Sequence, residues 1–275
     1  MGKCCQLVMG PAGSGKTTYC KYIKQYLEDL RRRPYMVNLD PAVEENNYDI
    51  DIDIRDLVTV EDVMEEMNYG PNGGLVFCLE YFLENIEWFE EQLGDYEDDY
   101  LIIDCPGQIE LYSHLPIMTT FVDFLKRNNY YICGVFLVDS QVLTDSAKYV
   151  SAVLCCLSVM SSLEIPHINV LSKMDLWSKN LQDRETFYEF LDNDPLFQSD
   201  LDEKMGDRYH ALNVALVELI ESYSIVGFHP LNINDEDTID ILLQKIDTCL
   251  QYYDDVEPHE PKDMDADFDD IAKLD

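Results

Sequence analysis

Basic residues are scarce in this chain, and their scarcity restricts the partners that it can bind. Only 19 Lys and Arg stand against 55 Asp and Glu in 275 residues, which gives a formal net charge of -36 at pH 7. A surface with this charge repels the phosphates of nucleic acids and the headgroups of anionic lipids. We therefore expect no direct binding of nucleic acid and no binding to membranes, and basic protein surfaces are better candidate partners.

The sequence also lacks a Cys-x-x-Cys pair, and we find no apolar run that approaches the length of a membrane span. Its nine cysteines are odd in number, which argues against a disulfide framework and against a zinc site. Reduced thiols are typical of the cytosol and the nucleus, so we expect a cytoplasmic protein. The start from Met1 to Cys5 resembles an acylation signal, but Gln6 stands where the myristoylation pattern requires Ser or Thr.

Short, continuously apolar runs alternate with longer segments of helical periodicity. Continuous hydrophobicity is typical of strands that are buried on both faces of a parallel sheet. The alternation predicts an α/β fold with a doubly wound, mainly parallel sheet of about six strands flanked by helices. The expected strands are Cys4–Met9, Tyr35–Leu39, Tyr100–Asp104, Ile132–Asp139, His167–Leu171 and Phe228–Ile233, and the expected helices are Thr17–Leu30, Leu115–Arg127, Asp145–Met160 and Asp237–Tyr252.

We expect one domain over residues 1–253, with helical insertions near 43–95 and 180–224. The stretch from Asn180 to Tyr209 is polar and interrupted at Pro195, as in a variable insertion. Residues 254–275 contain ten Asp or Glu and two Lys, a local net charge of -8. This composition predicts a disordered acidic tail, which we interpret as a solvated segment in preference to a docking site.

The segment from Gly10 to Thr17 reads Gly-Pro-Ala-Gly-Ser-Gly-Lys-Thr and fits the pattern G-x-x-x-x-G-K-[ST] without a gap. Glycines let backbone N–H groups wrap around phosphate oxygens, Lys16 reaches the β and γ oxygens and assists catalysis, and the Thr17 hydroxyl ligates Mg²⁺. The fold is therefore predicted to be that of a P-loop NTPase. Its predicted phosphate site comprises Gly13, Ser14, Gly15, Lys16, Thr17 and Thr18.

Carboxylates end two of the predicted strands beside the P-loop. Asp104 occupies the place of a Walker-B acid, which holds Mg²⁺ directly or through water. The Asp-x-x-Gly pattern that begins there predicts a switch: the Gly107 N–H senses the γ-phosphate, Gln108 orients the attacking water and Glu110 lies close behind. Asp40 ends the neighbouring strand and is a candidate for positioning water or Mg²⁺. The predicted metal ligands are thus Thr17, Asp104 and Asp40.

A guanine-selecting pair follows the fifth predicted strand, in the sequence Ser172-Lys173-Met174-Asp175. The Asp175 carboxylate accepts two parallel hydrogen bonds from guanine N1–H and the 2-amino group, which adenine does not offer, while the Lys173 stem lies along the base. The usual motif begins with Asn or Thr, and Ser172 replaces that residue here. Leu231 lies in a loop that falls where a backbone segment contacts the purine, and we include it in the predicted base site.

Several motifs occur together in one consistent order. Beyond the P-loop they are Asn-Leu-Asp-Pro-Ala at 38–42, Gly-Pro-Asn at 70–72, Asp-Cys-Pro-Gly-Gln-Ile-Glu-Leu at 104–111 and Ser-Lys-Met-Asp at 172–175. In this combination the chain resembles the GPN-loop GTPases, from about residue 4 to about residue 260. Gly-Pro-Asn alone is only a turn tripeptide, so its specificity depends on the motifs around it.

The resemblance implies a Mg²⁺-dependent switch that binds GTP and GDP and acts as a dimer, with Asn72 of one subunit reaching the phosphates of the other. An amide supplies no cation, so we expect slow hydrolysis of GTP to GDP and phosphate. The resemblance also implies a heterodimer with a sister GPN-loop GTPase (GPN-loop GTPase 1), or else a homodimer. Its further implications are contact with RNA polymerase II subunits, a role in assembly and nuclear import of that polymerase, and shuttling to the nucleus.

Two other functions are compatible with the same residues. An assembly chaperone or scaffold would use bound nucleotide structurally and turn it over negligibly. A nucleotide kinase would also pair a P-loop with an α/β fold, but it needs an Arg-rich lid over the phosphates. The triplet Arg31-Arg32-Arg33 stands after the first helix, at the end away from the P-loop, and we interpret it as a solvated helix terminus.

Overall fold

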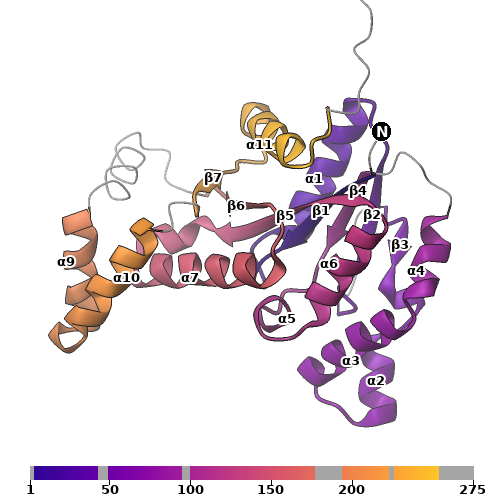
Figure 1. The fold of residues 1–275 in the computed structure, drawn as a ribbon, viewed down its shortest axis with the longest axis horizontal. Helices are drawn as coiled ribbons and strands as arrows, with labels where there is room; N and C mark the ends of the chain where they lie inside the picture. Colours follow the sequence, from indigo (N-terminus) through magenta and orange to yellow (C-terminus); the bar gives the residue numbers. More distant parts are fainter. Residues whose placement is uncertain (1–2, 43–48, 95–99, 177–193, 223–225, 254–275) are drawn as a thin grey trace, which may run out of the picture.

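A seven-stranded sheet, in which every pair of neighbouring strands is parallel, forms the centre of the computed structural model (Figure 1). The structure describes residues 3–42, 49–94, 100–176, 194–222 and 226–253. The strands lie in the order β3-β2-β4-β1-β5-β6-β7. Their bounds are β1 Lys3–Met9, β2 Pro34–Asn38, β3 Ile52–Asp53, β4 Tyr100–Asp104, β5 Tyr130–Asp139, β6 His167–Ser172 and β7 Phe228–Pro230.

The predicted α/β fold with a mainly parallel sheet is confirmed. The sheet has one strand more than the six expected, because β3 contains two residues and is too short to give an apolar run. Helices flank both faces of the sheet (Figure 1). The α-helices are α1 Lys16–Asp29, α2 Val60–Met67, α3 Pro71–Glu84, α4 Ile86–Leu93, α5 Glu110–Ser113, α6 Ile117–Arg127, α7 Ser146–Leu163, α9 Asp194–Met205, α10 His210–Ser222 and α11 Glu236–Cys249.

The strand order places the carboxyl end of β1 at a topological switch point. The chain leaves β1 through α1 toward β2 on one side, and later crosses from β4 through α6 to β5 on the other side of β1. In open α/β sheets, ligands bind in the crevice where the strand order reverses in this way. The loops after β1 and β4 are therefore the expected place for a site.

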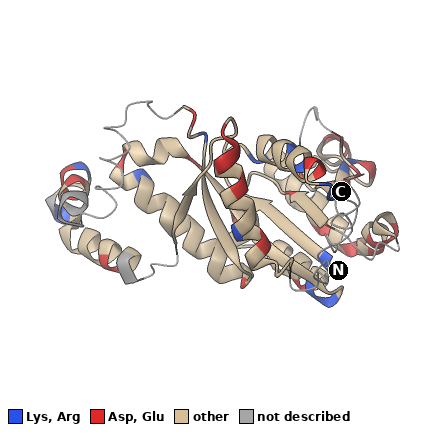
Figure 2. Cartoon of the chain, turned by 90° about the horizontal axis from the view of Figure 1, so that it is seen from above, with Lys and Arg blue, Asp and Glu red and all other residues tan. Residues whose placement is uncertain are grey.

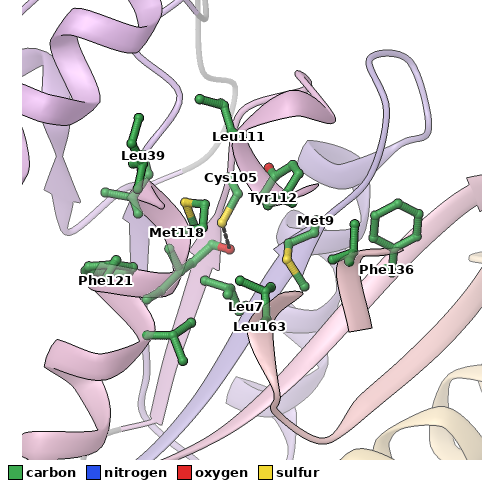
Figure 3. Close-up of a cluster of buried hydrophobic side chains, with 14 of the residues drawn as sticks. Leu7, Met9, Leu39, Cys105, Leu111, Tyr112, Met118, Phe121, Phe136 and Leu163 are labelled. Atoms are coloured by element: carbon green, nitrogen blue, oxygen red, sulfur yellow. Dashed lines mark hydrogen bonds between the residues drawn. The ribbon is translucent and has the colours of Figure 1, made fainter. Parts of the chain in front are cut away.

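Alternation along β1 divides the hydrophobic core between the two faces of the sheet. Leu7 and Met9 pack into one cluster of buried side chains, while Val8 packs into the other, because successive side chains of a strand point to opposite faces. Figure 3 shows the first cluster, in which Leu7 and Met9 lie among side chains from other elements, including Tyr112 and Phe121. This buried layer supports the sheet edge at which the site is built.

Helices form in the described parts of the two regions where we expected insertions, whereas residues 43–48, 95, 180–193 and 223–224 of those regions lie outside the described residues. Between β3 and β4 the chain forms α2, α3 and α4, and after β6 it forms α9 and α10, which lie beyond α7 (Figure 1). Pro195 is the second residue of α9, so it stands at the start of a helix, where a missing N–H is tolerated. The proposed acidic tail, residues 254–275, lies outside the described residues, and the domain boundaries stay a prediction.

The interpretation of the Arg31–Arg33 triplet as a solvated terminus was wrong for Arg32, whereas Arg31 and Arg33 are exposed. The Arg32 guanidinium makes two hydrogen bonds to the buried carboxylate of Asp247 on α11, at 2.8 and 2.6 Å, and lies 4.0 Å from the ring centroid of Tyr252. Burial opposes the charged form of Arg32, but the bonds to Asp247 outweigh it and raise the pKa of Arg32. Arg32 therefore ties the end of α1 to α11. The partner lies 215 residues away, so no local pattern indicated it.

The charge and the longest helix complete the outline of the fold. Acidic residues outnumber basic ones over the described helices (Figure 2), in line with the net charge of -36. The expectation that no apolar run approaches a membrane span was wrong for α7, whose 18 residues are long and apolar enough by length and composition. This helix buries Tyr149, Val153 and Cys156 in the core, and core helices of soluble proteins meet the same criterion.

Candidate active site

The P-loop follows β1 and its backbone requires glycine. A Cβ on Gly10 would lie 2.3 Å from the backbone oxygen of Leu137, so no other residue fits there. Gly13 and Gly15 have φ values of 78° and 91°, in the region that favours glycine. Gly15 caps α1 without a side-chain hydrogen bond, and the first turn of α1 contains no acidic residue. The first N–H groups of this helix are therefore available to an anion.

Two polar side chains of the P-loop fit a phosphate. The Ser14 hydroxyl is buried and has no hydrogen-bond partner among the described residues, which is costly unless a ligand supplies one. Lys16 is 8% exposed, and its Nζ donates to the backbone oxygen of Pro11 at 3.2 Å. A phosphate oxygen would accept from both groups. The predicted Thr18 is exposed on α1, on the same first turn.

The predicted magnesium ligands Thr17 and Asp104 lie together. Thr17 Oγ1 donates to Asp104 Oδ2 at 2.9 Å, which joins the start of α1 to the end of β4. A hydroxyl beside a carboxylate is an oxygen donor set that suits Mg²⁺. Within the described ranges, no group of three or more His, Cys, Asp or Glu gathers that would hold a metal by itself. These residues therefore fit a Mg²⁺ ion that shares its coordination with nucleotide phosphates and water.

Asp40 follows β2 and is held by a buried asparagine. The side chain of Asn38 accepts from the Asp40 N–H and donates to the Asp40 backbone oxygen, both at 3.1 Å, and it also donates to Asp53 Oδ1 at 3.0 Å. Burial raises the pKa of Asp40, while the Ala42 N–H and the positive charges of Lys16 and Arg55 act in the opposite direction. The carboxylate therefore lies within the electrostatic reach of the P-loop lysine.

An ion pair between Asp53, the last residue of β3, and Arg55, two residues beyond it, supports this arrangement. Arg55 Nη2 lies 2.5 Å from Asp53 Oδ2, and Arg55 Nε donates to Asp53 Oδ1 at 2.9 Å. Burial raises the pKa of Asp53, but the hydrogen bonds from Arg55 and Asn38 outweigh it and lower the pKa overall. The carboxylate of Asp53 thus stays charged and orients the amide of Asn38, which in turn holds the backbone of Asp40.

The loop after Asp104 packs directly against the P-loop. A Cβ on Gly107 would lie 2.9 Å from Ala12 Cα, so glycine permits this close approach. The hydroxyl of Tyr112, a residue of the buried cluster in Figure 3, donates to the backbone oxygen of Pro106 in this loop. The Gly107 backbone therefore lies against the P-loop, and its sensing of the γ-phosphate stays a prediction.

Gln108 and Glu110 point to different neighbours. Gln108 Nε2 donates to Asn72 Oδ1 at 2.8 Å, so two residues predicted to be catalytic are in contact within one chain. Glu110 is exposed as the first residue of α5. Burial raises the pKa of Cys155 on α7, and the charge of Glu110 raises it further. Glu110 therefore lies on the side of α7, and no bond joins it to the P-loop residues described above.

The predicted base loop is tied to the P-loop through Ser172. Its buried hydroxyl donates to the backbone oxygen of Ser14 at 2.6 Å and to that of Val138 at 3.1 Å. Lys173 has a φ of 58°, an uncommon conformation for a residue with a side chain, and its Nζ donates to Asp139 Oδ2 at 2.7 Å. The Ser172 hydroxyl thus ties the base loop to the P-loop, at the position where the usual motif has Asn or Thr.

Leu231 supports the base loop through its backbone. The Leu231 N–H donates to the oxygen of Leu171 at 2.8 Å, and the Leu231 oxygen accepts from the Met174 N–H at 3.2 Å. These bonds hold the half-buried Asp175 next to the loop after β7. The Leu231 N–H is thereby used within the protein, so its contribution to the base site is to position the loop that carries Asp175.

Four residues of this site escaped the sequence analysis. Asp139 ends an apolar strand as Asp104 and Asp40 do, so the same signal would have found it. Asp53 and Arg55 lie outside the motifs found in the sequence. Asn38 begins the motif at 38–42, but its bond to Asp53 depends on the pairing of β2 with β3, which the motif does not indicate.

These groups, a P-loop with an adjacent Thr-carboxylate pair and a Lys-x-Asp base loop, define a P-loop GTPase. A family model described as "Conserved hypothetical ATP binding protein" matches residues 8–252. A GPN-loop GTPase 3 of Dictyostelium discoideum is 53% identical over 262 residues, which cover 95% of this chain and 92% of the relative. A GPN-loop GTPase 3 of Xenopus tropicalis is 47% identical over 271 residues, covering 97% and 94%.

A solved structure agrees with these relatives. The apo form of a GTPase from Pyrococcus abyssi superposes with a TM-score of 0.72 at 26% identity, and the match covers 88% of this chain and 96% of that one. The chain therefore belongs to the GPN-loop GTPase family, and it binds and hydrolyses GTP.

Proposed function

We propose that this GTPase is a Mg²⁺-dependent switch that acts as a dimer. The observation that carries the metal dependence is the 2.9 Å bond between Thr17 Oγ1 and Asp104 Oδ2 beside the unpartnered hydroxyl of Ser14. Mg²⁺ held by Thr17 and Asp104 would neutralise charge that develops on the phosphates during hydrolysis. Asp40 would assist, as a carboxylate held beside the P-loop by Asn38.

The residues of the chain have distinct roles in this proposal. Lys16 and the N–H groups of the P-loop bind the β- and γ-phosphates, which they reach from the start of α1. Gln108 orients the attacking water, since it follows the glycine that packs on the P-loop. Asp175 accepts from the guanine edge, and Lys173 lies along the base. Glu110 lies toward α7 and is left outside the reacting groups.

Dimer formation is supported by the surface around the GPN loop. The loop contributes Gly70 and Pro71 to the start of α3, where Asn72 is exposed. Beside it, Met67, Tyr69 and Tyr81 are 47%, 48% and 37% exposed, and large apolar and aromatic side chains at a surface favour a protein interface. The partner would be a sister GPN-loop GTPase or a second copy of this chain, with Asn72 reaching the facing nucleotide.

The cellular role that we propose is assembly and nuclear import of RNA polymerase II, by a cytoplasmic protein that shuttles to the nucleus. It rests on the family membership alone. The strongly acidic surface is compatible with binding basic faces of polymerase subunits before they engage nucleic acid. Coimmunoprecipitation of polymerase subunits with the wild-type chain, compared in the presence of GTP and GDP, tests this role directly. Equal absence of these subunits in both nucleotide states would refute it.

An assembly chaperone with negligible turnover is the second candidate, and one observation favours it. An apolar cavity of about 480 Å³ lies between the P-loop, the switch and α7, lined among others by Pro11, Ile109, Phe136 and Ala152. A cavity that touches both nucleotide-sensing loops would change shape with the nucleotide. This candidate predicts that a variant deficient in hydrolysis still supports assembly.

Hydrolysis of GTP and ATP by the purified chain tests the enzymatic proposal. The rates would be measured with and without Mg²⁺, over a range of protein concentrations, alone and with a sister subunit. GTP-selective, Mg²⁺-dependent turnover that rises per molecule with concentration is expected. Thr17→Ala should lower this rate by about 100-fold or more, whereas Thr120→Ala, an exposed threonine on α6, should not. A Thr17→Ala variant with wild-type Mg²⁺ dependence would contradict the proposed metal site.

A further inference from the structure

The GPN loop contacts the switch of its own chain. Gln108 Nε2 donates to Asn72 Oδ1 at 2.8 Å, and 36 residues of sequence separate the two. Asn72 is the second residue of α3, and Gln108 lies between β4 and α5. The resemblance to the family implies a role for Asn72 across a dimer, and it says nothing of this bond.

The direction of the bond matters for catalysis. A glutamine amide has one acceptor oxygen and one donor nitrogen, and an unrestrained side chain samples either orientation. To orient an attacking water for phosphoryl transfer, the oxygen must accept a water proton. The Asn72 oxygen engages the nitrogen of Gln108. The Gln108 oxygen is thereby left for the water.

The backbone beside each end of this exposed contact is packed against a neighbouring element. Gly107 precedes Gln108 and packs on Ala12 of the P-loop, where a Cβ would come within 2.9 Å of Ala12 Cα. On the other side, α3 begins with Pro71, whose ring restricts the backbone, and Gly74 packs on Val60 of α2, where a Cβ would lie 3.3 Å from Val60 Cγ1. The contact is therefore made between two segments that are each anchored by close packing.

We propose that Asn72 is a positioning residue for the Gln108 of its own subunit. It fixes the amide of Gln108 so that the oxygen faces the attacking water, and it does so as a hydrogen-bond acceptor. This inference rests on the proposed hydrolysis mechanism, and it attributes the effect of Asn72 on kcat to the contact within the subunit and not to the contact across the dimer that the family implies. Accepting from Gln108 uses the Asn72 oxygen, whereas donating to the phosphates of a partner would use its nitrogen, so substitutions that change one atom separate the two roles.

A double-mutant cycle tests the proposal in the assembled enzyme. Gln108→Ala should lower kcat by about 100-fold, as loss of a water-positioning group does. Asn72→Ala should lower kcat by about 2- to 12-fold, the loss expected for one neutral hydrogen bond, with the Kd for GTP unchanged. The double variant should be no slower than Gln108→Ala, because Asn72 acts through the missing side chain. Asn85→Ala, at a half-buried asparagine at the other end of α3, serves as the control.

Asn72→Asp separates acceptor from donor. A carboxylate still accepts from Gln108 Nε2, so this variant should keep most of the wild-type kcat. A residue that donates to a phosphate would instead lose its function, because the new charge repels the phosphate. Retained activity in Asn72→Asp with loss in Asn72→Ala supports the positioning role.

Three results would overturn the proposal, and they are distinguishable from failure of the proposed function. Multiplicative losses in the double variant, or an Asn72→Asp variant as slow as Asn72→Ala, would show that Asn72 does not act through Gln108. Recovery of turnover on mixing Gln108→Ala chains with Asn72→Ala chains would show the same. In such a mixed dimer, the site that keeps Gln108 lacks its own Asn72, so it recovers only if the Asn72 of the other chain acts across the dimer. Absence of turnover in the wild type would refute the hydrolytic function itself, and the positioning role with it.

Discussion

Replacing Ser172 by alanine should weaken nucleotide binding, because the Ser172 hydroxyl holds the P-loop backbone that binds the nucleotide. Ser172 is 4% exposed, and its hydroxyl donates to the backbone oxygen of Ser14 in the P-loop at 2.6 Å. This bond links the base loop directly to the phosphate loop. Ser172→Ala removes the donor and leaves the Ser14 oxygen without this hydrogen bond.

The expected magnitude follows from burial. Removing one partner of a buried hydrogen bond costs about 1–3 kcal/mol, which corresponds to about a 5- to 150-fold change in an equilibrium constant. In the nucleotide-free chain the P-loop relaxes and recovers part of this energy. In the bound state both loops must hold one nucleotide in a fixed geometry. The loss should therefore be larger in nucleotide affinity than in the free energy of unfolding of the apo protein.

Two assays on the same variants separate these quantities. Titration with a fluorescent GDP analogue gives the Kd, and urea unfolding of the apo chain gives the stability. Ser172→Thr keeps the hydroxyl and should stay near the wild type, which controls for the change of side chain. An Ser172→Ala variant with wild-type affinity, or one whose whole loss appears in apo stability, would refute the idea that this bond couples the two loops.

Three further predictions concern the charged groups. Asp247→Asn should lower the free energy of unfolding by about 3 kcal/mol in urea, because Arg32 stays buried without its charged partner; a change below about 1 kcal/mol would contradict this. Burial raises the folded-state pKa of Asp40 above the ordinary 3.8, so its ionisation costs stability as pH rises through the folded pKa. Asp40→Asn should thus be more stable than the wild type at pH 7, and thermal melts should show that advantage shrinking as the pH falls toward 3.8. Asp139→Asn should weaken GDP affinity about 2- to 5-fold by freeing Lys173, with little change in melting temperature, since the pair is partly exposed; unchanged affinity would show that Asp139 does not position Lys173.

Motifs with a fixed backbone requirement were predictable from the sequence. The P-loop was found from its sequence pattern. That pattern begins with glycine because only glycine permits the close approach of Gly10 to Leu137. The sheet was found because its strands are buried on both faces and therefore read as continuous apolar runs. Asp104 could be assigned since it ends such a run, and the structure places it against Thr17.

Contacts between distant segments could not be predicted in this way. Nothing near Arg32 in the sequence indicates Asp247, and this one arginine of the triplet forms an ion pair instead of being solvated. The amide of Asn38 bonds to Asp53 only because β2 pairs with β3, a strand of two residues that gives no pattern. The contact between Gln108 and Asn72 depends in the same way on how α3 packs beside the switch.

The most direct test of the account is a change of base specificity at Asp175. In the proposed base site, the Asp175 carboxylate accepts hydrogen bonds from the two donors of the guanine edge, N1–H and the 2-amino group. Xanthine carries an oxygen in place of the 2-amino group, so an amide at this position should prefer it. Turnover of GTP, XTP and ATP would be measured for the wild type and Asp175→Asn. We predict a GTP-selective wild type and an XTP-selective variant. An ATP-selective wild type, or a variant with unchanged GTP preference, would contradict the assignment of this chain's base site.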